Sequence, residues 1–119
     1  MGLTNVKVKI MNPANLDQFV EIEVLVDTGA LYSVIPRSLL EKLQVKPRWR
    51  KFFTLANGEK IERDVGGVVF QWNEYGGYSP VIFGEEKDKA LLGVFSLEAM
   101  GLEVSPVKGE LRPMELLLL

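Results

Sequence analysis

The residue in this sequence that is best suited to acid–base chemistry is Asp27. It stands in the segment VLVDTGALYSVIP, residues 24–36, where an apolar, β-branched run leads into Asp-Thr-Gly and then turns apolar again. The chain contains no histidine and no cysteine, which removes the commonest general base, the commonest metal ligand and any thiolate nucleophile. Catalysis must therefore use carboxylates, hydroxyl groups or lysine, and a carboxylate can act as a general acid or a general base.

The context of Asp27 is more informative than the Asp-Thr-Gly triplet itself. An ionised carboxylate at the end of a buried strand is costly unless it accepts hydrogen bonds. Gly29 has no side chain, so its backbone N–H can approach that carboxylate closely. The plainer alternative is a strand-end turn in which Asp27 only caps the backbone. The triplet alone does not separate these two interpretations.

Length and composition indicate one domain, spanning residues 1–119. The formal net charge of −2 argues against nucleic-acid binding, because the neutralisation of phosphates needs a basic patch. The cations of KPRWRK, residues 46–51, are interpreted as the solvated start of a strand, with a substrate-facing rim as the alternative. The absence of cysteine is typical of a reducing cytosol, so we expect a cytoplasmic protein.

No segment predicts a membrane partner, a metal or a cofactor. The first ten residues, MGLTNVKVKI, alternate between apolar and polar and have no continuous apolar core. The leucine-rich end, ELLLL, is far shorter than the roughly 20 residues that span a bilayer. We interpret it as a last strand that is buried in the fold or against a partner. Without histidine or cysteine, we expect neither a metal nor a cofactor.

Hydrophobic periodicity predicts mostly β-structure with two short helices. Alternation predicts strands at residues 6–10 and 20–26, separated by the turn NPAN. Asn57-Gly58 is the strongest hairpin signal in the chain. The other predicted elements are a helix from Pro36 to about Val45, a hairpin turn at 73–78 before the strand SPVIFG, a solvated loop at 85–89, a strand at ALLG, a helix over VFSLEAMG capped by Gly101, and a closing strand, turn and strand. This set indicates an all-β barrel or sandwich.

Two motifs together resemble a known family. VLVDTGALYSVIP followed by ALLGVFSLEAMGLEVSP resembles the signature pair of the retroviral-like (retropepsin-type) aspartic proteases, above all the small single-domain members from archaea and bacteria. The resemblance implies a closed β-barrel or sandwich of the acid-protease type, half of a pepsin-like enzyme, with LANGEKIERDVG as the flap hairpin. Phe95, Ser105 and the single glycine of ANGEK depart from family patterns and leave the substrate pockets and flap movement open. Leu31 and Val34 either line such pockets or belong to the core.

The same resemblance implies roles for individual residues. Asp27 is the catalytic acid, and Thr28 and Gly29 complete its triplet. Substrate binding is assigned to five positions beside the triplet, at the flap tip and in the second motif: Ala30, Asn57, Gly58, Leu92 and Gly93. Pepsin-like relatives tend to have serine directly after the triplet. Ala30 cannot donate a hydrogen bond there, so we expect a weakly acid to neutral pH optimum.

Peptide hydrolysis by carboxylates needs two acids, and this chain has one Asp-Thr-Gly. The aspartates Asp17, Asp64 and Asp88 lie in polar or turn-like surroundings and lack the apolar approach of Asp27. A two-fold dimer would instead bring Asp27 of each copy to the symmetry axis. We therefore expect a homodimeric aspartic endopeptidase that acts on peptide or protein substrates. The alternative is a catalytically silent dimeric peptide-binding or scaffolding module on the same fold.

Overall fold

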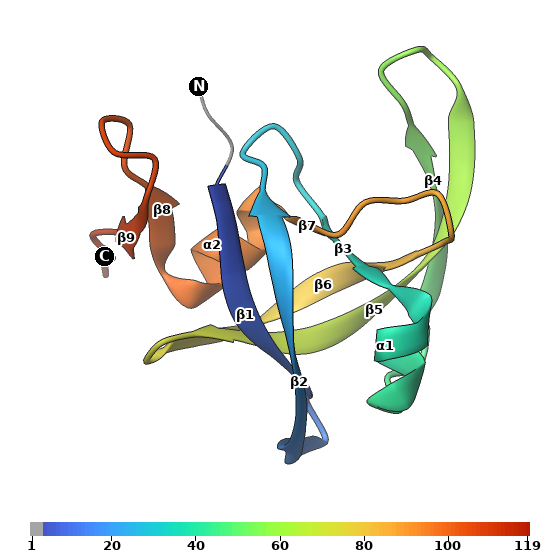
Figure 1. Ribbon diagram of the computed structural model, residues 1–119, viewed down its shortest axis with the longest axis horizontal. Helices are drawn as coiled ribbons and strands as arrows, with labels where there is room; N and C mark the ends of the chain where they lie inside the picture. Colours follow the sequence, from blue (N-terminus) through green and yellow to red (C-terminus); the bar gives the residue numbers. More distant parts are fainter. Residues whose placement is uncertain (1–3) are drawn as a thin grey trace.

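The computed structural model describes residues 4–119, and residues 1–3 of the alternating amino-terminal segment lie outside it. Over the described range the chain forms nine strands and two short helices (Figure 1). The strands are β1 (Thr4–Asn12), β2 (Asn15–Val26), β3 (Ser33–Pro36), β4 (Trp49–Thr54), β5 (Lys60–Trp72), β6 (Tyr75–Gly84), β7 (Leu91–Leu92), β8 (Leu102–Val104) and β9 (Leu111–Pro113). The helices are α1 (Arg37–Lys42) and α2 (Val94–Met100).

Seven strands form one sheet in the order β1-β2-β7-β3-β6-β5-β4, and β1 also pairs with β5, so that the sheet closes into a ring. At the β1–β5 joint, Ile10 lies opposite Phe70. At the β3–β7 joint, Val34 lies opposite Leu91. Because β7 is only two residues long, this second joint is short and the ring is not a regular barrel. The predicted mostly-β class with two short helices is confirmed, with this ring of strands in place of a regular barrel or sandwich.

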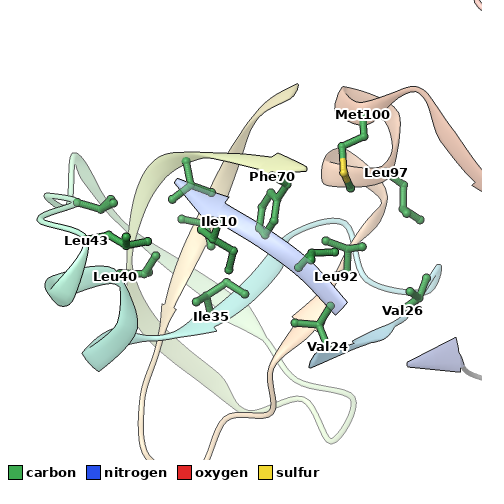
Figure 2. Packing of buried hydrophobic residues seen from close by; sticks show 14 of the residues in the cluster. Ile10, Val24, Val26, Ile35, Leu40, Leu43, Phe70, Leu92, Leu97 and Met100 are labelled. Atoms are coloured by element: carbon green, nitrogen blue, oxygen red, sulfur yellow. The ribbon is translucent and has the colours of Figure 1, made fainter. Parts of the chain in front are cut away.

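The core lies inside the ring and follows from the alternation of apolar residues. In β1 and β2, every second side chain points inward, so Val8, Ile10, Val24 and Val26 are almost fully buried. Figure 2 shows side chains from strands and both helices that converge there, among them Ile10, Val24, Ile35, Leu40, Phe70, Leu92, Leu97 and Met100. Full burial of one such side chain contributes about 1.5–3 kcal/mol to stability.

The two helices end for identifiable reasons. Helix α1 begins directly after Pro36 and ends earlier than predicted, because Gln44 adopts a left-handed backbone with φ of 61°. Its buried residue is Leu40. Helix α2 ends as predicted at Gly101, whose φ of 74° is left-handed. Each helix that covers the ring is thus short, at about two turns.

The two hairpins of the central sheet differ in how well they were predicted. The turn between β4 and β5 contains Asn57-Gly58, as predicted, and Gly58 has φ of 87°. The turn predicted at 73–78 is shorter, because Trp72 already pairs with Tyr75. Gly77 belongs to β6, and a Cβ there would lie 2.0 Å from the carbonyl oxygen of Ala99 in α2. The glycine therefore allows α2 to pack on β6 and does not mark a turn.

The carboxyl-terminal segment forms a strand, a turn and a strand as predicted, but its last residues do not extend the second strand. Strands β8 and β9 pair in an antiparallel sheet of their own. Beyond them, the side chains of Leu116 to Leu119 are 73% to 116% exposed. Within one chain the leucines are therefore not covered by the fold. Among the helices described, none has the length and apolar character needed to cross a membrane.

Candidate active site

Asp27 is the first residue after β2, at the point where that strand leaves the core. Val26 is buried and pairs in parallel with Leu92 of β7. The backbone N–H of Asp27 donates to the carbonyl oxygen of Leu92 at 3.0 Å. The side chain of Asp27 is half-buried. Strand β7 thus fixes the residue by its backbone and leaves its carboxyl group at the edge of the core.

The turn after Asp27 wraps around its carboxylate. The N–H of Gly29 donates to Asp27 Oδ1 at 2.9 Å, and the N–H of Ala30 donates to the Asp27 carbonyl oxygen at 3.1 Å. A Cβ at Gly29 would lie 3.2 Å from Oδ1, closer than most side chains approach. The predicted close approach of the Gly29 amide is therefore confirmed. Within residues 4–119, Oδ2 accepts no hydrogen bond.

The segment from β7 into α2 lies directly behind this loop. The N–H groups of Val94 and Phe95 donate to the carbonyl oxygens of Ala30 and Leu31 at 2.9 and 3.0 Å. A Cβ at Gly93 would lie 2.7 Å from the Leu31 carbonyl oxygen. Only a glycine allows two backbones to come this close.

This packing corrects two of the predicted substrate-binding positions. The side chain of Leu92 is 0% exposed, and Gly93 is buried. Both are predicted to bind substrate, as part of the apolar-apolar-Gly segment that the family resemblance places beside the active-site loop. Instead, they support the Asp27 loop from inside the fold, where a peptide cannot reach them.

Thr28 and Ala30 lie on the outer side of the loop. Thr28 is exposed, and in the described part of the chain its hydroxyl group has no hydrogen-bond partner. It lines a pocket of about 340 Å³ together with Val94, Leu97 and residues of the β8–β9 segment. Ala30 is half-buried beside the Asp27 turn. The surface next to the acid is therefore open on this side of the single chain.

The other two predicted substrate-binding residues lie at the tip of the β4–β5 hairpin, which projects from the ring (Figure 1). Asn57 and Gly58 are both exposed there. The turn is ordered by its own hydrogen bonds, because the N–H of Glu59 donates to Asn57 Oδ1 at 2.9 Å. The N–H of Leu55 donates to the Glu59 carbonyl oxygen at 2.7 Å. The predicted turn residues thus form a defined, solvent-facing tip.

Three aromatic rings connect this hairpin to the Asp27 loop. Tyr32, which follows the loop, packs edge-on against Phe53 of β4 with 5.4 Å between ring centroids. On its other side Tyr32 packs against Phe95 of α2 at 5.3 Å. Lys51 Nζ donates to the Tyr32 hydroxyl oxygen at 3.4 Å. No pattern in the sequence predicts this cluster, because its members are far apart along the chain.

A pocket of about 480 Å³ lies between the turn end of the β4–β5 hairpin and β7. Its apolar lining consists of Val34, Phe53, Leu55, Ile61, Ile82 and Leu91, and its charged rim of Glu59, Arg63, Lys87, Asp88 and Lys89. Val34 belongs to this lining and is not among the fully buried core residues. Leu31 does not belong to this lining and is 57% exposed on the loop.

Two of the other aspartates are held in ion pairs. Arg37 Nη2 lies 2.7 Å from Asp64 Oδ2, and Arg63 Nε lies 2.8 Å from Asp88 Oδ2. The hydrogen bond from Arg37 lowers the pKa of Asp64, and the hydrogen bond from Arg63 lowers the pKa of Asp88. Both carboxylates are thus stabilised in the ionised form, which does not suit a second, proton-donating acid. Among residues 4–119, no group of three or more carboxylates is arranged to hold a metal ion.

Comparisons with known proteins agree with this geometry. A model of the family described as aspartyl protease matches residues 6–94, well over half of the chain. That range contains the Asp27 triplet, the β4–β5 hairpin and the Leu92-Gly93 segment. No curated protein sequence matches the chain.

The structure is similar to the solution structure of Simian Foamy Virus (mac) protease, with a TM-score of 0.56 and 17% sequence identity over 80% of this chain and 92% of that chain. Such a likeness identifies the fold as retropepsin-like, as predicted. The family is identified by the matched range, which covers the acid, the hairpin and the first residues of the second motif, up to Val94. The chain therefore belongs to the aspartyl protease family.

Proposed function

We propose that this chain is a homodimeric aspartic endopeptidase that hydrolyses peptide bonds with a water activated by two Asp27 carboxylates, one from each copy. The observation that supports this best is the environment of Asp27. One carboxylate oxygen is fixed by the Gly29 N–H at 2.9 Å, while the other has no partner in the described chain. The free oxygen can accept a hydrogen bond from the attacking water.

The chemistry requires the two carboxyl groups to differ in protonation. The ionised Asp27 takes a proton from the attacking water, and the neutral one donates a hydrogen bond to the carbonyl oxygen of the scissile bond. As the tetrahedral intermediate breaks down, the carboxyl group that took the proton from water donates it to the leaving amine. Two carboxyl groups about 3 Å apart share one proton and titrate as a pair.

The second acid comes from a second copy because the single chain offers no suitable one. Asp64 and Asp88 are paired with arginines, and Asp17 is exposed on β2. A two-fold axis beside Asp27 would supply an identical residue in an identical turn. The leucines at 116–119 are exposed in one chain, and their burial between the two copies would remove an apolar surface from water.

The substrate proposed for this site is an extended peptide held beneath the β4–β5 hairpin. Strand-like peptides bind through backbone hydrogen bonds, with alternate side chains in pockets. The pocket of about 480 Å³ lined by Val34, Phe53 and Leu91 fits a large apolar side chain next to the scissile bond. Asn57 and Gly58 would close over the peptide from the hairpin tip. We propose the cytoplasm as the compartment, on the absence of cysteine alone.

A peptide library separates the protease from the alternative, a silent peptide-binding module. The wild type is expected to cleave peptides, and Asp27→Asn is expected to lose cleavage by at least about 1,000-fold while remaining a dimer by sedimentation. Asp17→Asn is the matched control, because it makes the same change at an exposed position and should retain activity. Equal cleavage by wild type and Asp27→Asn would refute the protease, and peptide binding without cleavage would favour the module.

A further inference from the structure

Three serines are buried behind the Asp27 loop, where the surrounding positions are apolar. Ser33 of β3 and Ser96 of α2 are 0% exposed, and Ser79 of β6 is 4% exposed. A buried hydroxyl group destabilises a fold by about 1–3 kcal/mol unless it is hydrogen-bonded. Three such groups in one place therefore need an explanation that packing alone does not give.

The three hydroxyl groups form one hydrogen-bonded chain with a single direction. Ser79 donates to the carbonyl oxygen of Pro80 at 3.0 Å, so it must accept from Ser96, whose Oγ lies 2.8 Å away. Ser96 has then used its only proton and must accept from Ser33. Ser33 in turn accepts from the backbone N–H of Gly93 at 3.0 Å.

The first donor of this chain belongs to the backbone that supports the acid. Gly93 follows Leu92, whose carbonyl oxygen accepts the hydrogen bond from the Asp27 N–H. Gly93 also lies against the loop itself, since a Cβ on it would be 2.6 Å from the Tyr32 carbonyl oxygen. The serine chain therefore connects β6, α2 and β3 to the backbone of Gly93, which lies against the Asp27 loop.

We propose that Ser33, Ser96 and Ser79 are positioning residues for Asp27, which fix Gly93 and through it the loop that orients the carboxylate. The catalytic part of this inference rests on the proposed function. Loss of the Ser33 hydroxyl group would leave the Gly93 N–H without its acceptor and would remove the donor to Ser96, which would keep only Ser79 as a partner. The turn from β7 into α2 would then relax, and the loop that it supports would move with it.

The test combines amide hydrogen exchange with kinetics on the full-length protein. In Ser33→Ala, exchange of the Gly93 amide should accelerate at least about 10-fold relative to amides in the β1–β2 ladder, which report global unfolding. Its kcat should fall about 10- to 100-fold with KM changed less than about twofold, as expected for a misplaced catalytic group. Ser79 lies at the end of the serine chain that is far from Gly93, so Ser79→Ala should show the same changes in exchange and kcat with a smaller magnitude. This variant replaces Ser33→Ala in the test if Ser33→Ala does not fold.

Ser105→Ala is the matched control, since Ser105 is also buried, at 8% exposure, but accepts from the Lys108 N–H at 3.3 Å, outside the chain of three. It should change neither the Gly93 exchange rate nor kcat. Unchanged Gly93 exchange in Ser33→Ala would overturn the proposal, and so would a fall in kcat that merely follows global unfolding. If the wild type cleaves no peptide, the proposed function fails, while the exchange rates still decide whether the serines hold Gly93.

Discussion

Substitution of Gly93 by alanine tests how tightly the second motif supports the Asp27 loop. The added Cβ would lie 2.6 Å from the Tyr32 carbonyl oxygen and 2.7 Å from the Leu31 carbonyl oxygen. Real Cβ atoms are not found that close to backbone atoms, so either the loop or the turn from β7 into α2 must move. Such a movement would break the hydrogen bonds from Val94 and Phe95 to the loop.

The size of the effect follows from these contacts. Overpacking in a well-packed site destabilises by about 1–3 kcal/mol, and each of the two backbone hydrogen bonds contributes about 1 kcal/mol net. The free energy of unfolding should therefore fall by about 3–5 kcal/mol, a large part of the 5–15 kcal/mol typical of a domain. Gly67→Ala in β5 is the matched control, because nothing lies within 4 Å of a Cβ there. It should be neutral or stabilising by less than about 1 kcal/mol.

Urea denaturation of the wild type and both variants, followed at one protein concentration, gives the measurement. The concentration is fixed because the stability of a dimer depends on it. Gly93→Ala should shift the midpoint to markedly lower urea, while Gly67→Ala should not. Midpoints that agree for Gly93→Ala and Gly67→Ala would refute the reasoning, since the backbone behind Asp27 would then give way without loss of stability.

Three further predictions concern the ion pairs, the hairpin tip and the apolar pocket. Arg37 lowers the pKa of Asp64 below the ordinary aspartate value of 3.8, so the ion pair stabilises the fold above about pH 4 and loses this contribution as pH falls through the lowered native pKa. The difference in urea midpoint between wild type and Arg37→Gln should therefore shrink below about pH 4. A difference that stays constant down to about pH 2.5 would contradict this prediction. Gly58→Ala puts a side chain at a φ of 87°, which destabilises the hairpin turn by about 1–2 kcal/mol. If the tip closes over substrate, this substitution should lower kcat/KM for peptide cleavage. Unchanged kinetics would argue against that closure. Val34→Phe should reduce the volume of the 480 Å³ pocket. It should lower kcat/KM about 10-fold more for peptides with a large apolar side chain next to the cleaved bond than for peptides with alanine there. An equal effect on the two kinds of peptide would show that the pocket does not select the side chain.

Local signals in the sequence predicted the turn at Asp27 correctly. Asp27 and Gly29 are two residues apart, so the backbone alone brings the Gly29 N–H to the carboxylate. Asn57-Gly58 likewise determines its own turn, because Gly58 adopts the left-handed backbone that the hairpin requires. Predictions of this kind succeed because they depend on a few neighbouring residues.

Features that depend on contacts between distant segments were missed or misplaced. Gly77 was interpreted as part of a turn, although its role is to let α2 approach β6, and that contact exists only in the folded chain. Leu92 was expected at the substrate, but β7 is inserted between β2 and β3, which buries it. The sequence signal for the serine chain was weak: Ser33 and Ser96 are hydroxyl residues in otherwise apolar segments, and only the fold brings them together.

The most direct test of the central proposal is to mix wild-type chains with Asp27→Asn chains. If both acids of the site are Asp27, and the chains are unfolded and refolded together in equal amounts, random pairing leaves about one quarter of the dimers with two aspartates. Cleavage activity per wild-type chain should then fall to about one half, and to about one quarter with a threefold excess of Asp27→Asn. Activity per wild-type chain that does not depend on the mixing ratio would show that each chain acts alone, and would contradict the shared site.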